Sequence, residues 1–390
     1  MKNKIDRNIN LALRWLIKSG IQNQNIKNLT KYGGFNAWYD ITSKKYSYLY
    51  SEITGYLITS MLFHYEVTKK KFFLKSAELS ANWLINNAQD KCGGFKCLYL
   101  IDKNLSYKKK ENYIYSFDNG VIINGLVNLY KITKKKKYLN SANKSGSFLI
   151  SNFFKRNFEL KPIFDIKKKK YIHSKHEWSM ISGSYHTKAC MGLINLYSVN
   201  KQKHLLTFAK KLLNFYTKKQ KKSKLFKSTN NSTNFHPYCY SLEGYWSCGK
   251  FLRSKRYLET SNFGTRELLK KINSDGLPPR ILYKNKLNYN ERIDILCQTL
   301  RLIILNLSQK KLTNIEKEKI NKLIKNILMY QKLKNKNLKI NGGFLWGKKS
   351  DGNNTNNVNS WVTSFAAQSL SIFNNKKAVK ILNSKPFYLV

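Results

Sequence analysis

The chain has 390 residues, 42% of them hydrophobic and 14% aromatic, which is enough apolar surface for a large folded core. Its 72 Lys and Arg against 21 Asp and Glu give a net charge of +51. The Lys residues are spread over all turns and polar faces and Arg is rare, so nucleic acid is not the expected partner. The charge still favours acidic ligands. No stretch approaches the roughly 18 to 20 apolar residues of a membrane span, and the first 20 residues do not resemble a signal peptide.

The cysteines are scattered, without the close spacing of a disulfide framework. In a chain of this size the pattern predicts reduced thiols and a cytoplasmic location. The six residues are Cys92, Cys97, Cys190, Cys239, Cys248 and Cys297.

Apolar periodicity predicts two sets of alternating helices along the chain. One set is expected at 51–65, 117–131, 184–198, 238–252, 293–307 and 359–373. Each is followed by a partner, at 72–88, 137–152, 203–217, 256–272 and 314–331, and the last is completed by 6–18 from the N-terminal end. Gly-Gly-Phe phrases at 33–35, 93–95 and 342–344 separate hairpins. Short β ribbons are expected only in the connections at 90–115, 155–182 and 276–290.

One phrase, Tyr-x-x-Thr/Asn-x-x-x-x-x-Leu-x-x-Ala, occurs three times. It starts at Tyr65, Tyr130 and Tyr197, a spacing of 65 and 67 residues. In each copy an apolar helix ends, a Lys-rich turn follows and an amphipathic helix begins. Because one hairpin cannot bury its own apolar face, the copies must pack on one another, which predicts a single repeat domain over residues 1–390.

The hairpins and the phrases at the helix starts resemble a known superfold. These phrases are Tyr115-Ser-Phe-Asp118-Asn-Gly120, Ser182-Gly-Ser-Tyr185-His186 and His236-Pro-Tyr238-Cys-Tyr-Ser-Leu-Glu243-Gly244. The whole chain resembles the six-hairpin α/α toroids, which include glycosidases, polysaccharide lyases, uronyl epimerases, terpenoid cyclases and protein prenyltransferases. It is most similar to toroids that accompany bacterial surface-polysaccharide synthesis. The resemblance implies an all-α (α/α)6 ring and a role in carbohydrate metabolism.

In such a ring the first helix of each hairpin lines the lumen, so function is expected where these inner helices begin. Acidic residues there are informative because the chain has few of them. Asp118, Glu243 and Asp294 are candidate catalytic acids, Glu52 is a candidate substrate contact, and Glu177 precedes an inner helix. The alternative for most of them is a cap or a partner of the helix dipole, and Asp294 has Arg292 nearby as a possible ion pair.

Two histidines also stand at inner-helix starts. His186 and His236 are candidate proton carriers, since histidine titrates near neutral pH, and a structural role is the alternative for each. His64 and His204 lie in the repeated turns and are expected at the surface.

Aromatic and polar side chains cluster at the same connections. A flat aromatic face covers a sugar or an isoprenoid equally well, and a sugar needs hydrogen bonds in addition. The candidate substrate-binding residues, beside Glu52, are Trp38, Asp40, Tyr115, Trp178, Tyr185, Tyr238, Arg280, Arg292, Gln298, Trp346 and Trp361.

Two enzymatic chemistries fit these residues, and neither needs a cofactor. Paired carboxylates, Asp118 with Glu243 or Asp294, would hydrolyse a glycosidic bond. A lyase or epimerase acting on uronates would move a proton with His186 or His236 and neutralise the substrate carboxylate with Arg280 or Arg292.

The isoprenoid branch of the superfold and a non-catalytic toroid remain as alternatives. Asp294, Cys297 and His236 imitate the zinc ligands of a prenyltransferase, but in the wrong order, so no metal is expected. The sequence therefore predicts a carbohydrate ligand, acidic if the charge is functional, and leaves the oligomeric state open.

Overall fold

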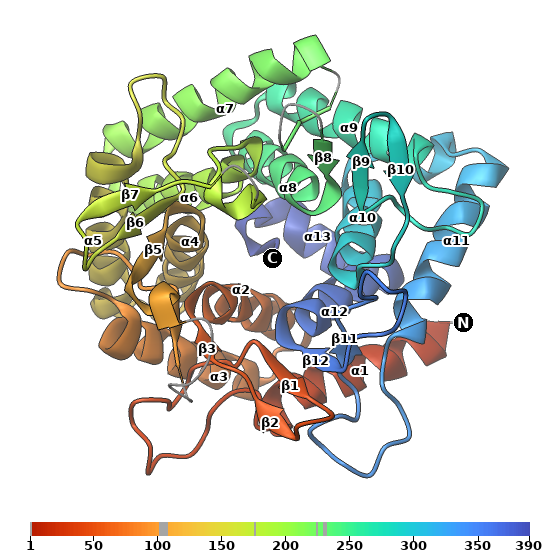
Figure 1. Ribbon diagram of the computed structural model, residues 1–390, viewed down its shortest axis with the longest axis horizontal. Helices are drawn as coiled ribbons and strands as arrows, with labels where there is room; N and C mark the ends of the chain where they lie inside the picture. The colour runs from red at the N-terminus through yellow and green to blue at the C-terminus, as the bar shows by residue number, and fades with distance from the viewer. Residues whose placement is uncertain (1, 101–107, 175–176, 224, 229–231) are drawn as a thin grey trace.

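The computed structural model describes residues 2–100, 108–174, 177–223, 225–228 and 232–390 of the chain. It forms a ring in which an inner layer of helices is surrounded by an outer layer (Figure 1). The inner helices are α2 (Ser51–Thr68), α4 (Ser116–Thr133), α6 (Ala189–Asn200), α8 (Phe235–Leu252), α10 (Ile293–Asn306) and α12 (Ser360–Asn374). The outer helices are α1 (Lys2–Lys18), α3 (Lys71–Trp83), α5 (Lys136–Phe153), α7 (Lys203–Ser223), α9 (Lys255–Lys270) and α11 (Asn314–Met329).

The ring closes because both ends of the chain contribute to one hairpin. α12 packs against α2 on one side and α10 on the other, and its outer partner is the N-terminal helix α1. The predicted (α/α)6 toroid is confirmed, including this pairing. One predicted inner helix is divided: a 3₁₀ turn at Ser184–Thr187 precedes α6.

Inner and outer helices differ in burial, as their positions require. In α4, residues 116–129 are all buried, because one side of the helix faces the lumen and the other the outer layer. The outer helix α9 buries only one stripe, which includes Tyr257, Ser261, Leu268 and Leu269. Among the described helices, none combines the length and apolar character needed to cross a membrane.

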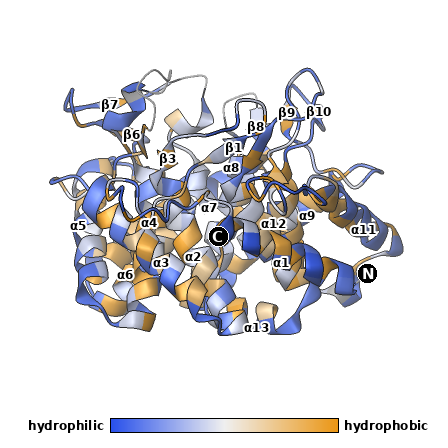
Figure 2. Ribbon diagram, turned by 90° about the horizontal axis from the view of Figure 1, so that it is seen from below, coloured by the Kyte–Doolittle hydropathy of each residue, from blue (hydrophilic) through white to orange (hydrophobic). Residues whose placement is uncertain are grey.

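Short antiparallel strands collect at one face of the ring, the face where the inner helices begin (Figure 2). The strands are β1 (Trp38–Asp40), β2 (Lys45–Tyr46), β3 (Leu49–Tyr50), β4 (Leu98–Tyr99), β5 (Tyr113–Tyr115), β6 (Ile163–Asp165), β7 (Lys170–Ile172), β8 (Ser232–Asn234), β9 (Ile281–Tyr283), β10 (Lys286–Asn288), β11 (Phe344–Leu345) and β12 (Asn357–Asn359). The ribbons expected at 90–115, 155–182 and 276–290 are confirmed. The sheet β11-β12-β1-β2, which joins residues far apart in the sequence, was not predicted.

The opposite face is closed by the C-terminal residues, which were also not predicted. Helix α13 (Lys376–Ser384) and a 3₁₀ turn at Pro386–Tyr388 lie in the middle of the ring in Figure 1. Asn124 and Asn128 on α4 each donate a hydrogen bond of 2.8 Å to the Phe387 carbonyl oxygen, and Gln368 donates one to the Tyr388 carbonyl. The lumen is therefore a pocket open at one end.

The three Gly-Gly-Phe phrases are structurally equivalent. Gln89 donates from Nε2 to the carbonyl oxygens of Gly93 and Ser141, at 2.9 and 3.0 Å, and accepts a hydrogen bond from Ser141 Oγ. Gln22 donates in the same way to the carbonyl oxygens of Gly33 and Ser76, and Gln331 donates to those of Gly342 and Asn8. The first glycine of each phrase has φ near +100° and a Cβ there would meet a backbone carbonyl, at Gly33, Gly93 and Gly342. Each phrase thus fixes an outer helix to the mouth of the ring.

The repeated Tyr-x-x-Thr/Asn phrase forms the turn at the closed face. Tyr130 accepts a 2.8 Å hydrogen bond from the amide of Lys134, which has a left-handed backbone (φ 59°) just after α4. Lys69 and Lys201 have the same conformation and bond after α2 and α6. This is the αL helix cap, formed here by lysine instead of the usual glycine.

We expect Lys134→Val to lower the free energy of unfolding by about 1–2 kcal/mol, because a β-branched residue is strained in the left-handed region. Lys134→Gly should not destabilise the protein, since glycine adopts positive φ without steric cost. Urea denaturation of both variants measures this. The control is Lys75→Val on the exposed face of α3, which should cost about 0.5 kcal/mol through helix propensity alone. Equal losses in the two valine variants would contradict the strained cap.

Candidate active site

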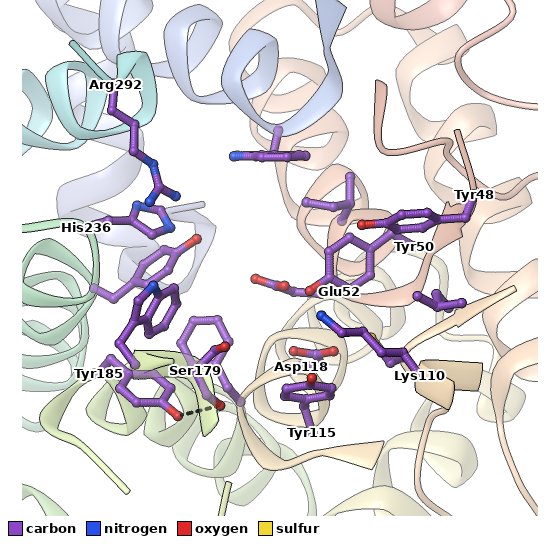
Figure 3. A pocket seen from close by; sticks show the side chains of 17 residues that line it. Tyr48, Tyr50, Glu52, Lys110, Tyr115, Asp118, Ser179, Tyr185, His236 and Arg292 are labelled. Atoms are coloured by element: carbon purple, nitrogen blue, oxygen red, sulfur yellow. Dashed lines mark hydrogen bonds between the residues drawn. The ribbon is translucent and has the colours of Figure 1, made fainter. Parts of the chain in front are cut away.

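A pocket of about 170 Å³ opens at the strand-bearing face of the ring (Figure 3). At about 30 Å³ per water, that volume holds about six waters. The lining comes from all six inner-helix starts and their connections: Tyr48, Tyr50, Glu52, Ile53, Cys97, Leu98, Lys110, Tyr115, Phe117, Asp118, Trp178, Ser179, Tyr185, His236, Tyr240, Arg292 and Trp361. Of the predicted site residues, Glu52, Tyr115, Asp118, Trp178, Tyr185, His236, Arg292 and Trp361 are brought together here.

The strands before the inner helices aim the first helical turns into this pocket. Tyr50 ends β3 and Tyr115 ends β5, and each has an extended backbone and serves as the N-cap without a side-chain capping bond. Glu52 and Asp118 follow in the first turns of α2 and α4. Neither acid is the N-cap residue, and both line the pocket.

Glu52 and Asp118 form a pair of carboxyl groups on one wall. Burial, and next the charge of Glu52, raise the pKa of Asp118 well above its ordinary value. Burial raises the pKa of Glu52 to about 7, although a hydrogen bond from Tyr50 and the charge of Lys188 oppose the shift. Asp118 Oδ2 is buried without a hydrogen-bond partner among the described residues. Near neutral pH, Asp118 holds a proton and Glu52 is close to its midpoint.

Asp294 has the opposite environment. Its Oδ2 accepts from Arg292 Nε and Nη2, at 3.1 and 2.9 Å, and from Trp361 Nε1 at 3.2 Å. Burial opposes ionisation, but Arg292 and His236 outweigh it, and the pKa of Asp294 lies below its ordinary value. Asp294 itself does not line the pocket; as a permanent anion it orients Arg292 and Trp361, which do.

His236 lies on the wall opposite the carboxyl pair, beside Arg292 (Figure 3). Its Nδ1 is 2.8 Å from Gln298 Oε1 and 3.6 Å from Asp294 Oδ2. Its ring packs against Trp178 and Tyr240, with centroids 5.6 and 4.4 Å apart. Burial lowers the pKa of His236 to about 3, so the imidazole is neutral at physiological pH.

Glu243 lies below the pocket in a fully buried ion-pair cluster. Its two oxygens bind Lys188 Nζ and Arg301 Nε, each at 2.6 Å, and Gln298 Nε2 at 3.4 Å. Burial lowers the pKa of Lys188 to about 8, although the charge of Glu243 opposes the shift. The predicted pairing of Asp118 with Glu243 or Asp294 is therefore replaced, in the pocket, by Asp118 with Glu52.

Other predicted residues lie outside the pocket. His186 is buried, with Nε2 3.0 Å from Ser116 Oγ, and holds two inner-helix starts together. The Tyr238 hydroxyl donates to the Gly264 carbonyl behind α8. Asp40 accepts from Ser43 in the β1 turn, at 2.7 Å from its amide and 3.0 Å from its hydroxyl. Glu177 is exposed at the start of the Trp178–Met180 turn.

Trp38, Trp346 and Arg280 stand around the mouth. Trp38 on β1 packs edge-on against Tyr48, a lining residue, with centroids 5.3 Å apart. Arg280 and Arg292 both lie near the Trp346 ring, with guanidinium carbons 5.2 and 5.0 Å from its centroid. Arg280 is half-buried, and of these two arginines only Arg292 lines the pocket.

Sequence reasoning missed Lys188 and Tyr240, which connect the pocket to the cluster below. Lys188 Nζ lies 4.6 Å from the Tyr240 ring centroid and is almost fully buried. The signal was available, since Lys188 stands inside an inner-helix start that is otherwise free of charge. Within the described residues, no group of three or more His, Cys, Asp or Glu side chains is arranged to hold a metal, so the resemblance to prenyltransferase ligands does not extend to geometry.

Comparison with known proteins identifies a family and a fold. The sequence profile described as "Glycosyl hydrolase family 76" matches residues 20–176 and 57–239, which together span more than half of the chain. The second match ends 63 residues after the first (239 minus 176), about one hairpin later. A sequence comparison with curated proteins finds no significant match.

Solved structures share the fold along nearly the whole chain. Cellobiose 2-epimerase from Bacillus thermoamylovorans B4167 superimposes with a TM-score of 0.76 at 14% identity, covering 96% of this chain and 99% of the epimerase. A D-mannose isomerase gives 0.74 at 11% identity, covering 95% and 97%. Unsaturated glucuronyl hydrolase from Bacillus sp. GL1 gives 0.63 at 12% identity, covering 96% and 98%.

We expect Asp118→Asn to stabilise the protein increasingly as the pH rises above about 4. The unfolded chain loses the Asp118 proton near pH 3.9, whereas the folded protein retains it, so wild-type stability falls with pH through Asp118. The variant lacks this contribution and keeps only the one from Glu52. The difference should be small at pH 4 and grow by about 1.4 kcal/mol per pH unit. Denaturant unfolding at pH 5, 6 and 7 measures it.

The matched control is Asp275→Asn at an exposed turn, which should show no such pH-dependent gain. A wild-type stability that rises with pH relative to Asp118→Asn would mean that Asp118 is ionised in the folded protein.

Proposed function

The chain belongs to glycosyl hydrolase family 76, and from that premise we propose that it hydrolyses a glycosidic bond with Asp118 as the general acid and Glu52 as the assisting carboxylate. This proposal assigns a reaction to the carbohydrate-active toroid that the sequence predicts. The observation that carries the proposal is the buried Glu52–Asp118 pair, whose members line one pocket and have raised pKa values.

Asp118 suits the role of acid. It keeps its proton at neutral pH, and its unpartnered Oδ2 can donate that proton to the glycosidic oxygen as the bond to the anomeric carbon breaks. A carboxyl that was already ion-paired, as Glu243 and Asp294 are, would have no proton to give.

Glu52 suits the complementary role. Lys188 and the Tyr50 hydroxyl both favour its ionised form, so it is the member of the pair that ionises first. As an anion it stabilises the oxocarbenium-like transition state and assists the attack on the anomeric carbon. The water that completes hydrolysis supplies the hydroxyl of the new reducing end.

The shape of the site supports a chain end or a short saccharide as substrate. The lumen is closed beneath by the Pro386–Tyr388 turn, so a polymer cannot pass through the ring. Trp361, Tyr185 and Tyr240 offer flat faces that can cover a sugar ring.

An acidic sugar is the finer proposal. Arg292 uses Nε and Nη2 on Asp294, which leaves Nη1 for a ligand carboxylate or other anion at the pocket. Lys110 is a second cation in the lining. The net charge of +51 would attract such a substrate from a distance.

We place the reaction in bacterial surface-polysaccharide metabolism inside the cell. The location inside the cell is supported by the six free cysteines, five of them buried, as in a protein kept in a reducing compartment. Fractionation of cells that express the tagged protein tests the location.

A second reaction, proton transfer on a uronate as in an epimerase or lyase, has one observation in its favour. Neutral His236 stands next to Arg292, so a base and a carboxylate-binding cation share a wall. Deuterium uptake from heavy water into an intact sugar would indicate this reaction, whereas new reducing ends would indicate hydrolysis.

We expect Asp118→Asn and Glu52→Gln each to lower kcat by roughly 10²- to 10⁴-fold, the usual effect of a lost acid or base. On aryl glycosides, whose leaving oxygen needs no proton, Asp118→Asn should lower kcat much less. The wild-type rate should rise through pH about 7, as Glu52 ionises, and fall where Asp118 loses its proton. Reducing-end assays on a panel of oligosaccharides and aryl glycosides measure this.

Asp275→Asn, far from the pocket, is the control and should retain full activity. A hydrolase whose rate is unchanged in both pocket variants would refute the assignment of the pair.

We expect Arg292→Met to lower kcat/KM for an acidic saccharide by roughly 10- to 100-fold, the worth of one charge-assisted hydrogen bond. For the neutral analogue the loss should be small. Arg280→Met removes the other guanidinium near Trp346, which does not line the pocket, and should leave kcat/KM for both substrates unchanged. Equal losses on acidic and neutral substrates would show that Arg292 acts only through Asp294 and the fold.

A further inference from the structure

A chain of hydrogen bonds leads from the buried ion-pair cluster to the pocket. Glu243 Oε2 is 3.4 Å from Gln298 Nε2, and Gln298 Oε1 is 2.8 Å from His236 Nδ1. Glu243 and Gln298 are fully buried, and His236 is 4% exposed. Glu243 is on the same helix as His236, two turns further on, while Gln298 comes from the neighbouring α10.

The carboxylate determines which way the amide of Gln298 points. Glu243 is ion-paired with Lys188 and Arg301, and a carboxylate paired in this way only accepts hydrogen bonds. If the amide were reversed, its oxygen would face an anion in a site without water, which is costly in a low dielectric. The amide nitrogen therefore faces Glu243, and the amide oxygen faces His236.

The amide in turn determines which nitrogen of His236 carries the proton. A carbonyl oxygen at 2.8 Å requires a donor, so Nδ1 is protonated, and in the neutral ring Nε2 is left as an acceptor. Asp294 Oδ2, 3.6 Å away, favours the same form but already accepts bonds from Arg292 and Trp361. The other charges that act on the ring are Arg292 and Lys188, which disfavour a second proton.

We propose that Gln298, anchored by Glu243, is a positioning residue that holds His236 with its proton on Nδ1, so that Nε2 accepts a hydrogen bond from a hydroxyl of the bound sugar. This rests on the proposed saccharide site. It gives the buried cluster a role beyond stability, since the cluster sets the hydrogen-bonding character of one pocket wall.

The direct test is nitrogen NMR of the protein labelled at its histidines, without substrate. Coupling patterns distinguish the two neutral tautomers, and His236→Gln assigns the signal. We expect the Nδ1–H form in the wild type between pH 6 and 8. Methionine is similar in size to glutamine but offers no amide oxygen. In Gln298→Met the population of the Nε2–H tautomer relative to the Nδ1–H tautomer should therefore rise by roughly 5- to 10-fold, the effect of one hydrogen bond.

The matched control is Gln368→Met. Gln368 is an equally buried inner-helix glutamine that binds the C-terminal segment at the closed end, at Tyr388 and Val390. It should lose stability to a similar extent but leave the His236 spectrum and KM unchanged. Gln298→Met should raise KM for the saccharide roughly 5- to 10-fold with little change in kcat.

An Nε2–H tautomer in the wild type, or a spectrum that Gln298→Met does not alter, would overturn the proposal. Because the spectra need no substrate, this result is separate from the proposed reaction: a protein without hydrolase activity could still show the tautomer, and an active hydrolase could lack it. A tautomer that shifts while KM stays constant would show that Nε2 does not contact the sugar.

Discussion

The close approach of the inner helices at glycines is the constraint on which the site depends. A Cβ on Gly55 would lie 2.8 Å from Ile122, and one on Gly192 would lie 2.1 Å from the Gly120 carbonyl oxygen. Gly125 is similarly tight against the Gly55 carbonyl, at 2.8 Å. Without side chains at these crossings, α2, α4 and α6 pack nearly in backbone contact, and the first turns of α2 and α4 must share one space.

That proximity explains why the two carboxyl groups in those turns cannot both ionise freely. Glu52 and Asp118 are buried side by side in the lining of a single pocket, with few cations to compensate them. Elsewhere in the lumen the acids are paired: Glu243 with Lys188 and Arg301, and Asp294 with Arg292. The protein thus contains two kinds of buried carboxyl, one fixed as an anion for scaffolding and one left able to exchange a proton.

The helices were predictable from the sequence because their evidence is local. Periodicity and the repeated Tyr phrase place both layers, and α4, expected at 117–131, spans Ser116–Thr133. The mouth sheet and the C-terminal closure were not predictable, because β1 pairs with β12 across more than 300 residues and the Phe387 carbonyl bonds to Asn124 from 263 residues away. Such contacts leave no periodic signal in short segments.

The candidate site was predictable in location but not in detail. Asp118 and His236 were named because they begin inner helices, and Arg292 because it can bind a sugar or its carboxylate; all three line the pocket. Which acid pairs with Asp118 could not be read from the sequence, since Glu243 is neutralised by Lys188 and Arg301, which are 55 and 58 residues away. An acid and its distant partner become a unit only when the ring brings their helices together.

The two ends of the inner helices therefore differ in how far their sequences repeat. At the closed end the repeated phrase produces the same left-handed cap three times, at Lys69, Lys134 and Lys201, whereas α10 and α12 end at residues with extended backbone. At the open end the helix starts differ more: α2 and α10 have an acid in the second residue, α4 has an acid in the third, and α8 has a histidine. The repeated turns at the closed end build the ring. The differences among the helix starts at the open end give the pocket an asymmetric set of acid, base and cation. The proposed hydrolysis, which must tell one end of a glycosidic bond from the other, needs that asymmetry.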